Sequence, residues 1–381
     1  MTSRQHSQAF DLFRAIAVSS VVFGHFFQSQ TRIPLWVKYI SQIPIQYGVP
    51  IFFLISGFLL AESFQSLRTT LPDLKQNYVA FMRRRIYRIY PAYLTALVFL
   101  FFFNHSQFLD VIVHAGNVHT FWKDYNRSMN GVFWSLGVEF QWYVLAPFMI
   151  SALLGANKNI CVAAIGVLLL CSVFTRNYYT FRFIRQDIDF SELIRLGSDQ
   201  TVIHLYAFAF GIFLYRIRES AMGIPKKMIR VFWIYLILAG MVSYHLFLQI
   251  NARSANLFVL ANLCYVSQIV LAAMIFHYRA FVFGSRIPYA VVSFVSLVSY
   301  GLYIWHLPVL HFVLSFRVSV LVQLILYTVF SLTVATVSYF LVERYFLRKK
   351  RHAEPPVEKL DRRNGKQLFG DETEWTNPEK S

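Results

Sequence analysis

The sequence predicts an all-α polytopic membrane protein with about ten transmembrane helices and with both termini in the cytoplasm. The chain has 381 residues, is 56% hydrophobic and only 14% charged, and is therefore too apolar for a soluble globular protein. Long uncharged runs recur along it, and most are long enough to cross a bilayer. Its Lys and Arg residues gather in short segments between these runs and in the C-terminal tail, as is typical of cytoplasmic loops.

The apolar runs give the expected spans in order. They cover residues 9–28, 45–63, 91–109, 132–154, 160–175, 200–217, 230–249, 255–277, 290–315 and 318–342. A cytoplasmic N-terminus places roughly twice as many Lys and Arg residues on the cytoplasmic side as on the other. The first run contains Arg14 and His25 and is not followed by a small-residue cleavage site, so we expect it to stay as the first span.

The spans and the tail define the expected domains. Residues 1–347 are expected to form one membrane domain, and residues 348–381 a charged, disordered cytoplasmic tail. On the opposite side, the long loops 110–131 and 176–199 are candidates for contact with an external acceptor. The formal charge of +17 lies in loops and tail, so nucleic-acid binding is not expected. The three cysteines lie in apolar runs without paired spacing, which indicates neither a disulfide framework nor a metal site.

The first span carries three ionisable groups. Arg14 and His25 are 11 residues apart, which places both side chains on one helical face, about 16 Å apart along the axis. Asp11 lies within about 60° of the same line. Because ionisable groups that face lipid are costly, this face is expected to look into the protein interior or a water-filled cavity.

A basic run precedes the expected third span. In FMRRRIYRIYP, residues 81–91, Arg84, Arg85 and Arg88 share a helical turn just before Pro91, where the span is expected to begin. Guanidinium groups suit phosphate, so one interpretation is a site for a phosphorylated cytosolic donor. The other interpretation is a basic anchor that follows the positive-inside rule.

Three further segments place polar residues inside apolar runs. In WSLGVEFQWYVLAP, residues 134–147, the Glu139 carboxylate needs a partner, and Arg14 or His25 is expected to supply it, in a structural ion pair or in catalysis. In SYGLYIWHLP, residues 299–308, Tyr300 and Tyr303 share a face one turn before His306, which is either a packing residue or part of a site. In IFFLISGFLL, residues 51–60, Ser56 and Gly57 are expected to let two helices pack closely, with no chemistry assigned to Ser56.

The sequence lacks the usual signatures of several enzyme classes. It has no G-x-S-x-G elbow, no Walker loop, no Rossmann fingerprint and no H-E-x-x-H. What remains is a histidine in a membrane span, with carboxylates and arginines available nearby. Such a group suits general-base activation of a hydroxyl or an amine.

Taken together and in this order, these segments resemble the acyltransferase-3 family of integral-membrane acyltransferases. The resemblance covers residues 9–346 and rests on FDLFRAIAVSSVVFGH, FFLISGFLL, RRRIYRIYP, WSLGVEFQWYVLAP and SYGLYIWHLP. It implies a ten-helix domain that takes an acyl group, usually acetyl, from acyl-CoA on the cytoplasmic side. The acyl group passes to a hydroxyl of a carbohydrate or related acceptor, often outside. Some members carry an appended SGNH domain, which is not seen in this sequence.

The resemblance also implies roles for the residues named above. By this resemblance, His25 would be the general base. Arg14 would bind a CoA phosphate or hold the side chains of Asp11 and Glu139 in position. Arg84, Arg85 and Arg88 would hold the phosphates of CoA, while Tyr300, Tyr303 and His306 would line the site. One departure is that Phe140 follows Glu139, where the commoner family pattern has two adjacent acidic residues. A mechanism that needs two carboxylates is therefore not expected here.

We thus expect a multi-pass O-acyltransferase of a bacterial inner membrane. Acetyl-CoA is its expected donor substrate, with no permanently bound cofactor, and a cell-surface or exported glycan is its expected acceptor. A small-molecule or lipid-linked acceptor is an alternative, and a transporter or flippase is another, which the lack of a visible inverted repeat disfavours. The sequence identifies neither the acceptor, its hydroxyl position, the acyl chain length nor the oligomeric state, and a homo-oligomer is among the open choices.

Overall fold

The computed structural model describes residues 3–70, 73–103, 107–218 and 289–352, and the account below refers to these ranges. Within them the chain is helical, without strands. The helices are α1 (Ser3–Ser29), α2 (Leu35–Thr70), α3 (Leu74–Phe103), α4 (Phe108–Ala115), η1 (His119–Phe121), α5 (Phe133–Gly155), α6 (Lys158–Ile184), α7 (Phe190–Gly197), α8 (Thr201–Arg216), α11 (Tyr289–Leu297), α12 (Ser299–Leu314), α13 (Val320–Ser338), η3 (Tyr339–Glu343) and α14 (Arg344–His352).

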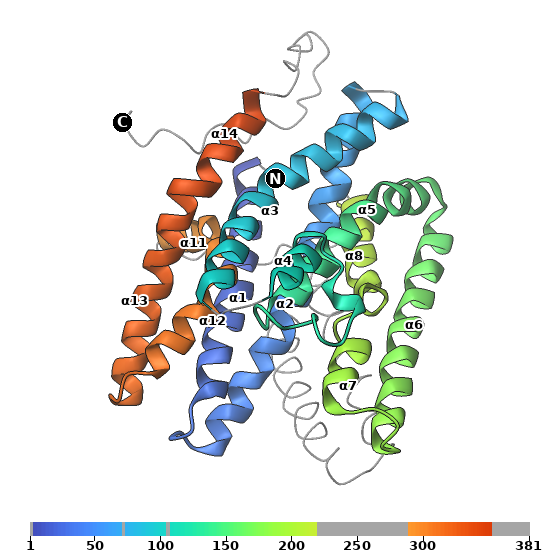
Figure 1. The fold of residues 1–381 in the computed structure, drawn as a ribbon. Coiled ribbons are helices and arrows are strands. Elements are labelled where there is room, and N and C mark those ends of the chain that lie inside the picture. The colour runs from blue at the N-terminus through green and yellow to red at the C-terminus, as the bar shows by residue number, and fades with distance from the viewer. Residues whose placement is uncertain (1–2, 71–72, 104–106, 219–288, 353–381) are drawn as a thin grey trace, which may run out of the picture.

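The long helices form a bundle in which α13 and α6 lie at opposite edges and α1 and α2 lie between them (Figure 1). The N-terminus and α14 lie at one end of the bundle, which we call the α14 end. Helix α1 ends at Ser29 near the other end, which we call the loop end, and α7 lies there as well (Figure 1). Because α5 runs from the loop end to the α14 end, residues early in α5 are near the end of α1.

The expected spans are confirmed in part. Among the helices that the structure describes, six are long and apolar enough to cross a membrane, and the pair α11 and α12 would make a seventh. The expectation of one continuous helix over residues 290–315 is wrong, because α11 and α12 are bent by 69° at a break at Val298. The expected spans 230–249 and 255–277 lie outside the described residues.

Two expected boundaries also differ. Helix α3 begins at Leu74, so Pro91 lies inside the helix instead of at the start of a span. A proline there removes only one backbone hydrogen bond, and a long helix packed in a bundle tolerates that loss. At the other boundary, α14 continues to His352, so the first residues of the tail that was expected to be disordered are helical. Residues 353–381 lie outside the described part.

Helices α2 and α8 cross with their backbones in contact. A Cβ atom added to Gly57 would lie 2.1 Å from the Phe208 carbonyl oxygen, and one added to Gly211 would lie 2.2 Å from the Leu54 carbonyl oxygen. Only glycine fits such a crossing, which resembles the small-residue contacts of membrane helices. The expectation that Gly57 allows close helix packing is confirmed.

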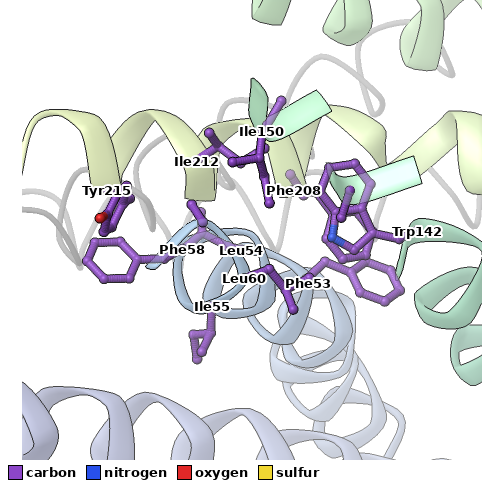
Figure 2. Close-up of a cluster of buried hydrophobic side chains, with 14 of the residues drawn as sticks. Phe53, Leu54, Ile55, Phe58, Leu60, Trp142, Ile150, Phe208, Ile212 and Tyr215 are labelled. Carbon is purple, nitrogen blue, oxygen red and sulfur yellow. The ribbon is translucent and has the colours of Figure 1, made fainter. Parts of the chain in front are cut away.

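Aromatic rings surround this crossing (Figure 2). Phe208 of α8 stacks on Trp142 of α5 with ring centroids 4.4 Å apart, and its centroid lies 4.6 Å from that of Phe53 of α2. Phe58 meets the edge of Tyr215 at 5.5 Å on the other side of the crossing. These contacts fix α5 relative to α2 and α8, and with it the side chains that α5 presents to the rest of the bundle.

The segment from α4 to η1 is packed into the bundle. Tyr93 of α3 donates to the His114 carbonyl oxygen at 2.9 Å, and the Gln141 amide of α5 donates to the Asn117 carbonyl oxygen at 3.0 Å. His114, Asn117 and His119 are all buried. This part of the predicted external loop 110–131 is therefore a plug held by α3 and α5.

Two buried histidines stack within the plug. The His114 and His119 rings lie 4.2 Å apart with an interplanar angle of 6°. Burial lowers the pKa of both rings, and for His119 it lowers the pKa to about 3, with His114 contributing to the shift. The pair is therefore neutral at physiological pH. Gly137 of α5 allows this arrangement, since an added Cβ would lie 2.9 Å from His119 Cε1.

Replacing Gly57 with alanine should destabilise the bundle. The new Cβ would overlap the α8 backbone, which cannot move away as a flexible side chain would, so we expect a loss of about 2 kcal/mol or more in unfolding free energy. Gly166→Ala is the matched control, because a Cβ at Gly166 of α6 meets nothing within 4 Å. Thermal unfolding in detergent measures both variants, and an equal loss for the two would contradict the crossing.

Acid should destabilise the plug. The folded-state pKa of His119 lies below its ordinary value, so the stability that depends on the neutral ring is complete above about pH 6.5 and is lost as the pH falls toward about 3. Thermal unfolding of the wild type and of His119→Gln between about pH 7 and about pH 5 tests this. The variant should show the weaker pH dependence, and identical slopes would show that the plug does not titrate.

Candidate functional site

His25 of α1 and His306 of α12 meet near the loop end. The His25 Nδ1 atom lies 3.1 Å from His306 Nε2, and the two rings stack with centroids 5.1 Å apart. His306 is fully buried, whereas His25 is partly exposed. The residue predicted as the base and a residue predicted to line the site are thus in direct contact.

The hydrogen bonds of His306 determine where the protons of the neutral pair lie. Its Nδ1 atom is 2.8 Å from the Tyr303 carbonyl oxygen and 3.2 Å from that of Leu302. A carbonyl only accepts, so this Nδ1 carries the hydrogen and His306 Nε2 is left as an acceptor. His25 must then donate its Nδ1–H to His306, which leaves His25 Nε2 with a free lone pair. That atom is the basic atom of the pair.

The helix that carries His306 is held to α5 and to the segment before it. Tyr303 hydrogen-bonds the Ser135 hydroxyl at 2.5 Å and the Val132 carbonyl oxygen at 3.1 Å. The Asn130 amide donates to the Ile304 carbonyl oxygen at 3.1 Å. These contacts fix the rotation of α12, and therefore the direction of the His306 ring, from a part of the chain more than 160 residues earlier.

An arginine of the same segment lies beside the histidine pair. The Arg127 guanidinium donates from Nε and Nη2 to the two oxygens of Asp199, at 2.8 and 2.9 Å, and Asn126 donates to the same carboxylate at 2.8 Å. Asp199 is fully buried, while the Arg127 side chain is 41% exposed. The positive charge of Arg127 acts on His25 and on Tyr303, so the guanidinium group is part of the electrostatic environment of His25.

Glu139 lies deeper, one turn after Ser135 on α5. It accepts hydrogen bonds from Tyr143 at 2.5 Å and from Ser56 of α2 at 2.9 Å. The expected partners were Arg14 or His25, and the structure instead shows two hydroxyls bound to this carboxylate. Ser56, to which the sequence assigned no chemistry, therefore has a polar role. The charges of Glu139, Arg85 and Arg88 all act on Tyr143, which places the carboxylate near the basic run of α3.

Asp11 ties α1 to α11. Its two carboxylate oxygens accept from Tyr289 at 2.7 Å and from Ser296 at 2.8 Å, and the side chain is buried. Along the helix it lies about 21 Å from His25. Arg14 lies one turn further along α1 and is partly exposed. The contacts of Asp11 position a helix, and its predicted part in catalysis stays a prediction.

The basic run of α3 presents its side chains in different directions. Arg85 is buried, donates to the Ser63 hydroxyl at 2.9 Å and lies over the Phe81 ring. Arg84 is partly exposed and Arg88 is exposed. The run therefore combines one arginine fixed against α2 with two that are accessible at the α14 end.

A second buried carboxylate faces this run. Glu343 ends the π-helical turn η3, is only 5% exposed, and the charge of Arg88 acts on it. The charges of both Glu139 and Glu343 act on Tyr300, whose hydroxyl donates to the Ile89 carbonyl oxygen at 2.8 Å. Glu343 stands in an apolar run, which is a sequence signal for a buried carboxylate. It was nevertheless not among the predicted site residues.

The predicted residues thus form two groups. His25, Tyr303 and His306 lie together toward the loop end, and the remaining group extends toward the α14 end. Its members are Tyr300, Glu139, Arg84, Arg85 and Arg88. Helices α5 and α12 contribute to both groups, so one bundle interior connects them. Within the described ranges, no group of three or more His, Cys, Asp or Glu side chains is arranged to hold a metal ion.

The sequence reading missed Arg127, Asp199 and Ser135. Asp199 belongs to the predicted external loop 176–199, yet it is completely buried in a contact with a residue 72 positions earlier. No local pattern shows such a pairing. Ser135 stood in a segment that the sequence did single out, but its partner lies on another helix.

Comparison with known proteins identifies the family of the chain. The family model of the acyltransferase-3 acyltransferase domain matches residues 7–341, which include all the described helices from α1 to α13. No curated protein and no solved structure matches the chain. Because the match covers most of the sequence, the chain belongs to the acyltransferase-3 family, and it is a membrane acyltransferase.

Proposed function

We propose that this protein transfers an acetyl group from acetyl-CoA to a hydroxyl of a cell-surface or exported carbohydrate, with His25 as the general base. The observation that carries the proposal is the hydrogen bond from His25 Nδ1 to His306, because it leaves His25 Nε2 free to accept a proton. The basic residues near the α14 end make that end the cytoplasmic one. The donor then arrives from the α14 end and the acceptor from the loop end.

The reaction needs one proton carrier between the two substrates. His25 Nε2 accepts the proton of the acceptor hydroxyl as its oxygen attacks the thioester carbonyl carbon. When the carbon–sulfur bond breaks, the imidazolium returns the proton to the departing sulfur. The products are the acetyl ester and the free thiol of CoA. His306 accepts the Nδ1 hydrogen throughout and stabilises the positive charge that forms on His25.

The donor is an elongated molecule, and the distances along the bundle suit it. Arg84, Arg85 and Arg88 bind the phosphates near the α14 end, and Arg14 adds a further cation on that side. Arg14 and His25 are about 16 Å apart along α1, which is a length that an extended pantetheine arm covers. The thioester thus reaches His25 while the nucleotide stays near the cytoplasm, as expected for a multi-pass protein of the bacterial inner membrane.

The histidine pair gives the first test. Purified protein with labelled acetyl-CoA and a carbohydrate acceptor should transfer label, and His25→Ala should lower kcat at least about 100-fold. His306→Phe keeps a ring but loses the acceptor for the His25 Nδ1–H. It should also lower kcat, and should shift the pH profile of the remaining activity.

His311→Ala is the matched control, because this histidine lies on the same helix α12 but is exposed. It should behave as wild type. Transfer that persists unchanged in His25→Ala would remove His25 as the base. If neither the wild type nor any variant binds acetyl-CoA, a transporter becomes the better interpretation.

The basic run gives a second test. Arg85→Ala and Arg88→Ala should each raise the KM for acetyl-CoA about tenfold or more, because a charge-assisted contact to phosphate is worth about 1.5–3 kcal/mol. The KM for the acceptor should change less. Arg83→Ala removes the same charge from the same stretch of α3 at an exposed position. Equal effects on both substrates in Arg85→Ala would indicate a role in packing or anchoring, which thermal unfolding would reveal.

A further inference from the structure

An arginine with spare donors is fixed near the basic nitrogen. The buried carboxylate of Asp199 engages Nε and Nη2 of Arg127, and the fork holds the planar guanidinium in one orientation. Within the described part of the chain, Nη1 of this arginine makes no hydrogen bond. The side chain is 41% exposed, so its unused N–H groups face a region that a solute can reach.

An indole ring lies beside this guanidinium. The Arg127 Cζ atom is 5.8 Å from the Trp134 ring centroid, and the His204 ring lies 5.4 Å from the same indole. Trp134 is partly exposed and is adjacent in sequence to Ser135, which binds Tyr303. The exposed part of the indole and the fixed N–H donors of Arg127 are therefore adjacent, at the start of α5.

Both groups lie near the reacting atoms. The positive charge of Arg127 acts on His25 and Tyr303, and Asn130, three residues later in the same segment, is bonded to α12 next to His306. The segment from Arg127 to Trp134 therefore contacts Asp199, just before α8, through Arg127, and contacts α12 through Asn130.

The charge balance of the pair indicates the class of ligand. Asp199 is fully buried and neutralises Arg127, so the pair offers hydrogen-bond donors without a net charge. Such donors suit hydroxyl and ring oxygens, whereas the negative face of an indole attracts the polarised C–H groups of a sugar ring. A neutral pyranose presents C–H groups on its faces and hydroxyl and ring oxygens at its edge.

We propose that Arg127 and Trp134 form the acceptor subsite and that they bind a neutral pyranose ring with one hydroxyl directed at His25. This inference rests on the proposed function and names the acceptor class and the residues that select it. Arg127 positions the sugar through its free N–H groups, and Asp199 positions Arg127. The subsite lies at the loop end, separate from the phosphate-binding arginines of α3.

The experiment uses the full-length protein in detergent with saturating labelled acetyl-CoA. Methyl glucopyranoside, methyl galactopyranoside and methyl rhamnopyranoside serve as acceptor probes, with glycerol and methyl glucuronide for comparison. At least one neutral pyranoside should be acetylated with a lower KM than glycerol, and the glucuronide should gain no large advantage. Trp134→Leu should raise the KM for that pyranoside about tenfold, with the KM for acetyl-CoA unchanged.

Two further variants separate binding from folding and from chemistry. Arg127→Ala leaves Asp199 buried without a counter-charge and is prone to misfold, so Arg127→Gln combined with Asp199→Asn removes both charges together. This double variant should raise the pyranoside KM similarly, and it should lower sugar transfer more than it lowers the slow hydrolysis of acetyl-CoA by water. Trp122→Leu and Arg182→Ala are the matched controls, since both residues are exposed outside the subsite, and they should leave the KM unchanged.

The outcomes distinguish the subsite from the proposed function. If acetyl-CoA is bound and consumed but no pyranoside is acetylated, or if the Trp134 and Arg127 variants lower hydrolysis as much as sugar transfer, the subsite is wrong while the acyltransferase chemistry stands. A strong preference for the glucuronide would overturn the neutral class. If acetyl-CoA is neither bound nor consumed, the proposed function itself fails.

Discussion

The polar contacts between the first helix and the last helices are the constraint on which the rest of the bundle depends. Asp11 binds α11, His25 binds α12, and the Val22 carbonyl oxygen accepts a hydrogen bond from Tyr327 of α13 at 3.1 Å. Apolar packing alone specifies helix rotation weakly in a membrane, because lipid tails are as apolar as side chains. Polar groups must find defined partners there, so these contacts fix the register of α1.

This register also explains how one bundle interior holds two groups of polar residues. Glycine contacts bring α2 against α8, and the aromatic rings around them hold α5, which presents Ser135 to one group of residues and Glu139 to the other. Helix α12 does the same with Tyr303 and Tyr300. Helices α5 and α12 therefore contribute to both groups at different depths, and the rise of each helix sets the separation of its side chains.

The sequence predicted features that depend on local periodicity. Arg14 and His25 share a face because both belong to one helix, and Gly57 was predicted to allow close packing because small residues do so in apolar helices. The pairing of His25 with His306 joins residues 281 positions apart, and the Asp199 contact with Arg127 joins residues 72 apart, so no local pattern contains either. The break at Val298 was missed because the apolar run continues through it without a proline.

The long sequence separation of the histidine pair has a consequence for biogenesis. Helix α1 enters the membrane first, and its partner His306 is synthesised 281 residues later. At about 5–20 residues per second, the ribosome needs roughly 15–60 s to reach it. During that time the polar face of α1 has to be sheltered by water, by lipid headgroups or by the insertion machinery. The histidine pair is therefore assembled late in synthesis, when α12 packs against the α1 helix that was inserted first.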